Sequence, residues 1–248
     1  MPRLAISNLR PFLTAIMAAM LAAIAPPLHA ETGAGRHAPS AGTYQRHGVA
    51  SYGPFTVVDP RTAILKAVTD EDSPAQFSAM LRDFPALSTL ALVECPGTYD
   101  DRANLQLGRM IRAAGLAIHV PAGGSVRSGA VELVFAGTAL RIDDGAEFAV
   151  HAWADEDGLE ASDYPADAQE NSKYLEYYRE MGMAPQRAEA FYAMTNSVPF
   201  EQARWFGAAE MRQWVIEGRS DYAMERKLEQ PAPAEAVLAQ LDSEPVLH

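Results

Sequence analysis

Short apolar runs alternate with segments of helical periodicity along most of this 248-residue chain, and the alternation limits the folds that it can adopt. Strand-like runs cover residues 52–59, 87–93, 116–120, 139–143 and 147–150. The spacing of apolar residues predicts helices at 73–84, 101–114, 170–181 and 185–194, and a further helical turn or two within 200–214; the run 130–135 suits a helix or a strand. Strands that alternate with helices pair in parallel, because each helix carries the chain back across the sheet. The sequence therefore predicts one α/β domain with a mainly parallel sheet over residues 48–220.

Two of the predicted helices have clear end signals. Ser73 is a candidate N-cap with Pro74 at the first helical position, and Phe77 and Met80 then fall on one face. Gly115 directly follows the helix predicted at 101–114, as a C-terminal glycine should.

The first thirty residues have the pattern of a secretory signal peptide. Arg3 and Arg10 precede an uncharged apolar run at 12–25, and Ala30 offers a cleavage site. The run is shorter than the roughly twenty residues that span a bilayer. We therefore expect cleavage of residues 1–30, no stable membrane insertion afterwards, and a periplasmic or secreted protein. Residues 31–47 are predicted to form a flexible lead-in and residues 221–248 a flexible tail.

Charge and cysteine content exclude several classes of protein. The formal net charge is −12, and it becomes more negative without residues 1–30, which hold two arginines and no acidic residue. Nucleic-acid binding needs a basic surface, so no nucleic-acid partner is expected. Cys95 is the single cysteine, so no intramolecular disulfide can form.

The sequence predicts neither a cofactor nor a metal site. An acidic run at residues 155–160 contains Asp155, Glu156, Asp157 and Glu160. It lacks the spacing of a calcium-binding loop. We interpret it as a solvated loop.

A serine, a histidine and a glycine turn stand out as candidate functional residues. Ser128 lies beside small residues, and His151 follows the strand-like run 147–150. The turn Pro96-Gly97-Thr98 comes shortly after the strand-like run 87–93. A serine nucleophile, a histidine base and a turn that offers backbone N–H groups are the parts of an acyl-transfer site.

On these motifs the chain resembles the superfamily of the Clp protease peptidase subunit and the crotonases, most closely its exported bacterial branch. The resemblance covers residues 87–217. In that superfamily a strand ends in a Pro-Gly-Gly turn, a helix and a strand follow, and a serine then begins a helix. A histidine follows after one more strand. The resemblance implies a Clp/crotonase-like spiral of βαβ units.

The resemblance also implies roles for individual residues. Ser128 takes the place of the nucleophile and His151 that of the base, while the backbone N–H groups of Thr98 and Gly129 take the place of the oxyanion donors. Thr98 replaces the second glycine of the family turn, which a threonine can do only if the turn does not require positive φ. At the third catalytic position the chain offers Asn196, preceded by Thr195, instead of an aspartate. Either side chain can orient an imidazole by hydrogen bonding, but neither stabilises the charged ring as a carboxylate does.

Each candidate also has a purely structural interpretation. Ser128 suits a helix N-cap, and His151 suits a strand end. Ser125, in a Gly-Gly-Ser segment, competes as nucleophile, whereas His119 has no matching serine. Cys95 has the pattern of a small buried apolar residue.

Two further features allow more than one interpretation. Glu132 interrupts the apolar run 130–135; it could face solvent or a subunit contact, or pair with Arg127 or Arg141. Aromatic residues at helical spacing are typical of a core or helix–helix contact, and they also offer anchors for the self-association that the resemblance implies: Tyr174, Tyr177, Tyr178 and Phe191.

The sequence thus predicts an exported serine hydrolase that acts on a peptide or other acyl substrate through a Ser128–His151 pair. The alternative is a catalytically inactive binding or scaffold protein with the same fold. An acyl-CoA enzyme of the crotonase type ranks third, since coenzyme A is not expected outside the cytoplasm. The expected partners are a small acyl or peptide substrate and further copies of the chain, in a homo-oligomer.

Overall fold

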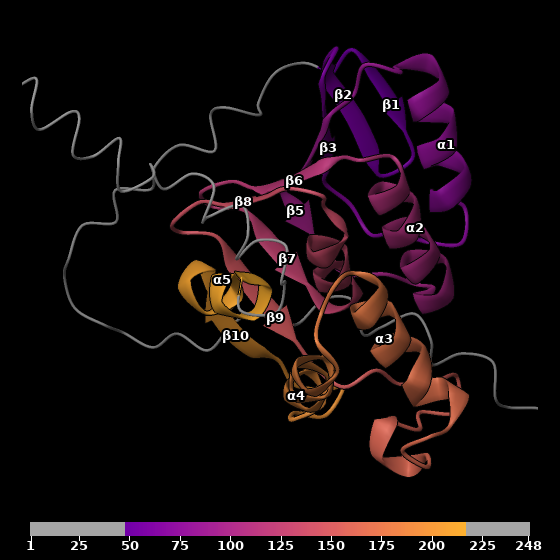
Figure 1. Ribbon diagram of the computed structural model, residues 1–248. Helices are drawn as coiled ribbons and strands as arrows, with labels where there is room; N and C mark the ends of the chain where they lie inside the picture. Colours follow the sequence, from indigo (N-terminus) through magenta and orange to yellow (C-terminus); the bar gives the residue numbers. More distant parts are fainter. Residues whose placement is uncertain (1–47, 217–248) are drawn as a thin grey trace, which may run out of the picture. The chain divides into compact units, whose positions relative to one another are not determined.

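Ten strands form two sheets in residues 48–216, the part of the chain that the computed structural model describes (Figure 1). The strand order is β1-β2-β3-β4-β6-β8 in the larger sheet and β10-β9-β7-β5 in the smaller one. The strands of the larger sheet are β1 (Ala50–Tyr52), β2 (Phe55–Asp59), β3 (Thr62–Leu65), β4 (Thr89–Leu92), β6 (Ala117–Val120) and β8 (Leu140–Ile142). Those of the smaller sheet are β5 (Glu94–Cys95), β7 (Ser125–Arg127), β9 (Glu147–Val150) and β10 (Arg204–Gly207).

Most strand pairs are parallel, as predicted from the alternation of strands and helices. In the larger sheet β3 pairs with β4, β4 with β6 and β6 with β8 in parallel, and only the hairpins β1–β2 and β2–β3 are antiparallel. In the smaller sheet β5–β7 and β7–β9 are parallel, and β9–β10 is antiparallel. The predicted fold class, a mixed α/β domain with a mainly parallel sheet, is therefore confirmed.

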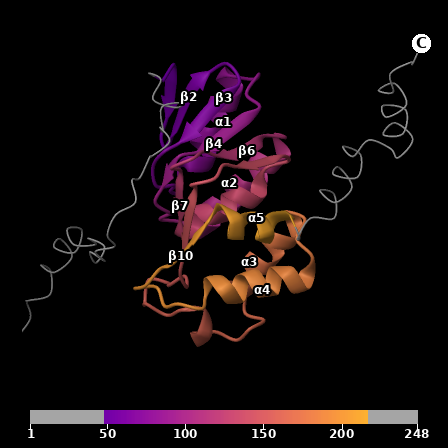
Figure 2. The same cartoon turned by 90° about the vertical axis from the view of Figure 1, so that its left-hand side faces the viewer.

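Helices connect and cover the parallel strands. Their bounds are α1 (Ser73–Asp83), α2 (Asp101–Ala113), α3 (Gln169–Glu180), α4 (Pro185–Thr195) and α5 (Ala208–Ile216), with 3-10 helices η2 (Ser128–Ala136) and η3 (Ala161–Asp163). Helices α1 and α2 pack side by side, and α2 packs on η2 (Figure 1). In Figure 2, α3, α4 and α5 gather at the end of the domain away from β2 and β3.

The helix ends follow from local chemistry. Helix α2 begins after Asp100, whose side chain accepts a hydrogen bond of 2.9 Å from the Ala103 N–H, and it is followed by Gly115 at φ +70°. Helix α1 has its N-cap at Asp72, one residue before the predicted cap, so that Ser73 is the first helical residue. The predicted face of α1 is correct, since Phe77 and Met80 are both fully buried.

Several short strands differ from the prediction. The run 52–59 is a hairpin rather than one strand, because a turn at Gly53, with φ +56°, separates β1 from β2. The strands β3 and β7 were not predicted. Residues 204–207 form strand β10 ahead of helix α5, where only helical turns were predicted.

The segment after Ser128 is a buried 3-10 helix. All seven residues from Ala130 to Ala136 are buried, so η2 is apolar on every side apart from Glu132. Complete burial explains why its periodicity could not separate a helix from a strand.

Three predicted regions fall wholly or partly outside the described residues. They are the signal peptide at 1–30, the lead-in at 31–47 and the tail at 221–248, together with residues 217–220 of the predicted domain. Within residues 48–216, no helix has both the length and the apolar character needed to cross a bilayer.

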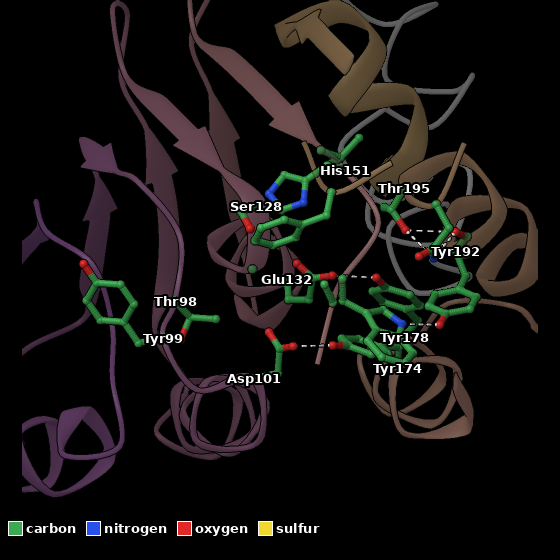
Figure 3. Close-up of a pocket in the computed structure, with 16 residues that line it drawn as sticks. Thr98, Tyr99, Asp101, Ser128, Glu132, His151, Tyr174, Tyr178, Tyr192 and Thr195 are labelled. Atoms are coloured by element: carbon green, nitrogen blue, oxygen red, sulfur yellow. Dashed lines mark hydrogen bonds between the residues drawn. The ribbon is translucent and has the colours of Figure 1, made fainter. Parts of the chain in front are cut away.

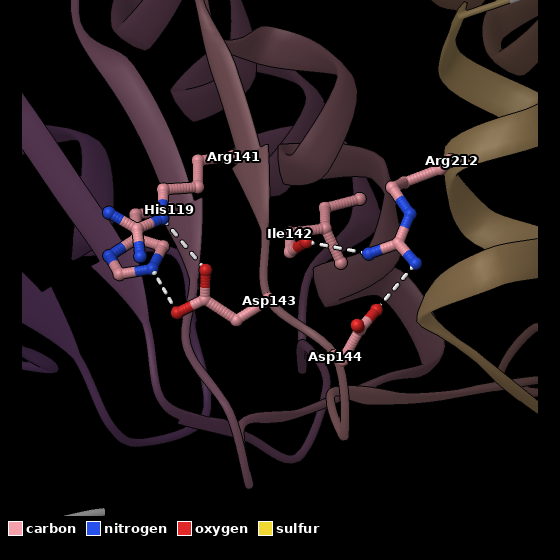
Figure 4. A network of polar contacts seen from close by, with 6 residues as sticks. All are labelled: His119, Arg141, Ile142, Asp143, Asp144 and Arg212. Carbon is pink, nitrogen blue, oxygen red and sulfur yellow. Dashed lines mark hydrogen bonds and ion pairs between the residues drawn. The ribbon is translucent and has the colours of Figure 1, made fainter.

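The side chain of Arg212 fastens α5 to the turn after β8 (Figure 4). Its guanidinium donates to the Ile142 carbonyl at 2.8 Å and to the Asp144 carboxylate at 2.7 Å. We expect Arg212→Ala to lower the free energy of unfolding by about 1–2 kcal/mol, because it leaves a partly buried carbonyl without its donor. Asp144 is 92% exposed, so Asp144→Ala should cost under about 0.5 kcal/mol. Urea unfolding of both variants measures the difference, and equal losses would contradict this account.

Candidate active site

The predicted site residues follow three neighbouring parallel strands of the smaller sheet. Thr98 comes after β5, Ser128 directly after β7 and His151 directly after β9. The carboxyl ends of parallel neighbours meet at one edge of a sheet, which is where ligands bind in open α/β folds. The topology thus brings together residues that are 53 positions apart in sequence from Thr98 to His151.

These residues line one cavity of about 270 Å³ (Figure 3). Thr98, Ser128, Gly129, His151 and Asn196, all five predicted site residues, contribute to its wall. In Figure 3, Ser128 and His151 lie at one end of the cavity, with Glu132 and Asp101 below them in this view. The structure therefore gathers the whole predicted set around a single hollow.

Ser128 has an unusual backbone conformation. Its φ is +50°, and it is the only residue other than glycine with positive φ among residues 48–216. A side chain is strained there, and such strain concentrates at functional sites. Arg127, not Ser128, is the N-cap of η2, so the hydroxyl of Ser128 does not have the capping role that its sequence position suggested.

The Gly97 turn packs directly against Ser128. Gly97 has φ +138°, and a Cβ atom at this position would lie 3.0 Å from the Ser128 Cβ and 3.4 Å from its Oγ. A Cβ at Gly129 would come within 2.5 Å of the Thr98 Cγ2. Glycines at these two places are what let the turn approach the start of η2 so closely.

Hydrogen bonds hold the turn and the start of η2 in place. The Asn104 amide on α2 donates to the Gly129 carbonyl at 2.6 Å and accepts from the Thr69 hydroxyl at 3.0 Å. The Thr69 N–H in turn donates to the Gly97 carbonyl at 3.1 Å. The N–H of Gly129 belongs to the first turn of η2, where backbone donors have no partner within the helix.

A backbone carbonyl orients the ring of His151. Its Nδ1 lies 2.8 Å from the Ala152 carbonyl oxygen. A carbonyl only accepts, so Nδ1 carries the proton and Nε2 of the neutral ring has a lone pair for a proton. The Phe200 ring contacts the imidazole edge-on, with 4.9 Å between ring centroids. Among the hydrogen bonds of residues 48–216, none joins Ser128 to His151.

The backbone around His151 is braced by a later part of the chain. Strand β9 pairs antiparallel with β10, Val150 opposite Arg204, and the Ala152 N–H donates to the Val198 carbonyl at 2.9 Å. These contacts fix the backbone of Val150 and Ala152, the residues before and after His151.

Asn196 lies in the cavity wall but is hydrogen bonded elsewhere. Its Nδ2 donates to the Tyr192 carbonyl at 2.8 Å and to the Thr195 hydroxyl at 3.2 Å. Its Oδ1 is buried and accepts no hydrogen bond from the described part of the chain. The Nδ1 of His151 has the Ala152 carbonyl as its partner instead.

Two carboxyl groups of the cavity were not predicted as site residues. Glu132, 7% exposed, follows Ser128 by four positions, and the Tyr178 hydroxyl donates to its Oε1 at 2.6 Å. Asp101 begins α2, and the Tyr174 hydroxyl donates to its Oδ2 at 2.6 Å. Burial raises the pKa of Glu132 to about 8; the Tyr178 hydrogen bond opposes this rise, and the nearby charge of Asp101 adds to it. The sequence signal for Glu132 was its position as the single acidic residue of an apolar run, four residues after Ser128.

Arg127 and Arg141 are not the partners of Glu132. Arg127 pairs with Glu94 and donates to the Ser125 hydroxyl, and Arg141 pairs with Asp143.

The competing candidates lie outside this cavity. Ser125 is buried in β7, where its hydroxyl accepts from Arg127 at 2.9 Å. His119 is 2.9 Å from Asp143 in a second hollow of about 510 Å³ beside β6, and no serine or cysteine lines that hollow in residues 48–216 (Figure 4). Cys95 is fully buried and donates to the Leu65 carbonyl at 3.4 Å, and burial raises the pKa of its thiol.

The remaining side chains of interest have structural roles. In the acidic loop, Asp155 accepts from the N–H groups of Asp157 and Leu159, and no group of three or more potential metal ligands was found in residues 48–216. The aromatic residues of α3 and α4 are core residues, since Tyr174, Tyr177, Tyr178 and Phe191 are at most 5% exposed. Burial removes them as anchors for a subunit contact.

No model of a protein family matches the sequence, and no curated protein matches it. Among solved structures, the chain is similar to the 1510-N membrane protease specific for a stomatin homolog from Pyrococcus horikoshii, with 14% identity, 63% of this chain and 70% of that chain covered, and a TM-score of 0.42. It is also similar to a ClpP1 mutant from Listeria monocytogenes, with 14% identity, 64% and 89% coverage, and a TM-score of 0.42. At such identities the likeness concerns the fold alone.

Proposed function

We propose that this protein is a serine hydrolase that acts on a peptide or another acyl substrate. The observation that carries the proposal is the strained backbone of Ser128 at the carboxyl end of β7, in one cavity with a histidine whose Nδ1 is hydrogen bonded to a carbonyl. A positioned hydroxyl and a neutral imidazole are the two groups that nucleophilic acyl transfer requires.

In the proposed reaction, Ser128 Oγ attacks the substrate carbonyl carbon while His151 Nε2 takes the hydroxyl proton. The backbone N–H groups of Thr98 and Gly129 stabilise the oxyanion. His151 then gives the proton to the leaving group, which departs with the electrons of the broken bond and leaves an acyl-Ser128 ester. Water, deprotonated by His151, attacks that ester and releases the acid and the free serine.

The Ala152 carbonyl is the proposed orienting group for His151. It accepts from Nδ1 and so fixes the ring and its tautomer, the role for which the sequence offered Asn196. A neutral carbonyl stabilises an imidazolium less than a carboxylate does, so we expect slower turnover than a full triad gives. Asn196 keeps a place in the wall of the cavity, where its buried Oδ1 can accept from a substrate N–H.

The rim of the cavity suits an extended substrate. Tyr99 and Phe200 both line it, and both are unusually exposed for large apolar side chains, at 83% and 47%. Exposed aromatic residues beside a polar cavity are typical of a surface that contacts a ligand.

Labelling with a fluorophosphonate probe tests the proposal. The probe phosphonylates a serine only where a base and an oxyanion site activate it, and peptide mapping should place the modification on Ser128. The second candidate function is a non-catalytic binding protein, which the lack of a described Ser128–His151 hydrogen bond favours. Absence of labelling at pH 7–8, where a histidine base is neutral, would decide for that second function.

Gly97→Ala should slow labelling of Ser128 on the order of ten- to a hundredfold, because its Cβ would displace the nucleophile. The matched control is Gly115→Ala. Gly115 also has positive φ, at +70°, but a Cβ there would meet no atom within 4 Å. The control should therefore lose about 1 kcal/mol of stability and keep its labelling rate. Equal labelling rates in the two variants would show that the Gly97 contact is unimportant.

We further propose that the protein acts after export and as a homo-oligomer. Export rests on the pattern of residues 1–30, and N-terminal sequencing of the protein from its native host should find Glu31 first.

Sedimentation at moderate salt tests self-association, for which the buried aromatic residues of α3 and α4 supply no contact.

A further inference from the structure

Two carboxyl groups form the floor of the cavity beside Ser128. Glu132 lies four residues after Ser128 on η2, and Asp101 lies at the start of α2, which packs against η2 (Figure 3). A Cβ at Gly129 would be 3.4 Å from the Asp101 Oδ1. The Asp101 carboxylate therefore lies next to Gly129, the residue that follows Ser128. The two acids therefore line the same cavity as Ser128 and His151, with Glu132 buried and Asp101 half-buried.

Each carboxyl is fixed in position by a tyrosine. The Tyr178 hydroxyl donates to Glu132 and the Tyr174 hydroxyl to Asp101, each at 2.6 Å. Burial and the neighbouring carboxyls raise the pKa of both phenols, so the tyrosines stay neutral donors. Phenols in this arrangement hold the carboxyls rigidly without neutralising them.

The described wall of the cavity has carboxyl groups but no strongly basic side chain. Its lining contains Asp101, Glu132 and His151, and it contains no lysine or arginine from residues 48–216. Buried charges in proteins are normally paired, and a carboxyl without a cation takes up a proton instead. The raised pKa of Glu132 fits a carboxyl whose cationic partner comes from outside the chain.

The dimensions and the aromatic walls suit one long side chain. The volume of about 270 Å³ is at the lower end of ligand sites. Trp153, Tyr174 and Tyr178 line it, and such rings favour cations as neighbours. On the outer side, the Lys173 ammonium lies 4.9 Å from the Tyr174 ring centroid and 5.4 Å from that of Trp153.

We propose that this cavity selects substrates with a cationic side chain, a lysine or arginine next to the bond that is cleaved, and that Asp101 and Glu132 are its counter-charges. The inference rests on the proposed hydrolase function and specifies its substrate class. Its basis is the placement of two tyrosine-held carboxyls in a cation-free, side-chain-sized cavity beside Ser128.

The test is a binding experiment that does not need turnover. Two tetrapeptides, Ala-Ala-Lys-Ala and the same peptide with norleucine for lysine, are titrated calorimetrically into the full chain carrying Ser128→Ala. Norleucine keeps the length of the side chain and removes its charge. The lysine peptide should bind about tenfold more tightly or better, as charge-assisted hydrogen bonds to two carboxyls predict. Equal affinities, or tighter binding of the norleucine peptide, would overturn the proposal.

Variants of the two acids locate the effect. Glu132→Gln, added to Ser128→Ala, keeps an acceptor for Tyr178 and should reduce the preference for lysine at least about fivefold, with little change for norleucine. Asp101→Asn should also reduce the preference for the lysine peptide, and it replaces Glu132→Gln in the test if that variant does not fold. The control Glu71→Gln makes the same carboxyl-to-amide substitution at an exposed residue outside the cavity, and it should leave the preference unchanged. An equal loss in the control would mean that net charge, and not this cavity, selects the peptide.

The outcomes separate this inference from the proposed function. Fluorophosphonate labelling of Ser128 without any lysine preference would leave the hydrolase and remove the cationic pocket. A lysine preference without labelling would remove the hydrolase and support a binding site for cationic peptides.

Discussion

Replacement of Ser128 by alanine is expected to reduce hydrolysis of activated esters, and labelling by a fluorophosphonate, at least about a thousandfold, because the variant lacks the atom that forms the acyl bond. The fold should persist, since the change removes one partly buried hydroxyl for which no hydrogen bond within residues 48–216 was found. Alanine also retains a Cβ at positive φ, so the backbone strain stays the same. Initial rates with a p-nitrophenyl ester and in-gel fluorescence measure the two losses.

His151→Ala should cost nearly as much, because a nucleophile and its base act as a unit and their separate losses do not add. The controls are Ser125→Ala and His119→Ala. Both residues lie outside the cavity and are hydrogen bonded to Arg127 and Asp143, so both variants should stay close to wild-type activity. A dead Ser125→Ala with an active Ser128→Ala would show that the nucleophile is wrongly assigned.

Glu132→Gln is expected to change how stability depends on pH. Folding raises the pKa of this buried carboxyl from 4.5 to about 8, so between these pH values the folded state holds a proton that the unfolded state has released. The contribution of Glu132 to the free energy of unfolding of the wild type should then fall as pH rises from about 4.5 to 8, and level off above that. At about 1.4 kcal/mol per pKa unit, the loss amounts to roughly 3–5 kcal/mol.

The glutamine variant lacks this titration. Its stability relative to the wild type should therefore increase steadily across the same pH window, and at pH 9 it should be the more stable protein. Urea unfolding of both proteins from pH 4.5 to 9 in matched buffers gives the difference, in which contributions from all other groups cancel. Parallel curves would mean that Glu132 is ionised throughout and that its surroundings already hold a counter-charge.

Much of the fold could be predicted because the longer elements carry their own signals. Helix α2 has an acidic N-cap, an apolar face and a closing glycine, and strand β9 is a mostly apolar run after a turn, so both were located almost to the residue. Strand β7 could not be predicted, because three residues between a glycine pair and a serine carry no periodicity. Strand β10 forms only because β9 is there to pair with it.

The site shows the same division between local and long-range information. Ser128, His151 and the Gly97 turn were recognisable from neighbouring residues, and the order β9-β7-β5 brings them to one cavity. The partner of the His151 Nδ1 is a backbone carbonyl, which every residue possesses and no sequence pattern marks. Asp101 and Glu132 lie 31 positions apart in the sequence, and both belong to the cavity because α2 packs on η2.

The brace between β9 and β10 sets the order in which the site can be completed. The contact between Gly97 and Ser128, and the hydrogen bonds of Thr69 and Asn104 to this region, involve only residues 69–129. His151 depends on Val198 and on strand β10, which ends at residue 207. A nascent chain or a fragment that stops before residue 198 therefore contains the nucleophile without a positioned base. If the proposed hydrolase function is correct, such a chain cannot cleave its neighbours, and hydrolytic competence arises only when the domain is almost entirely in place.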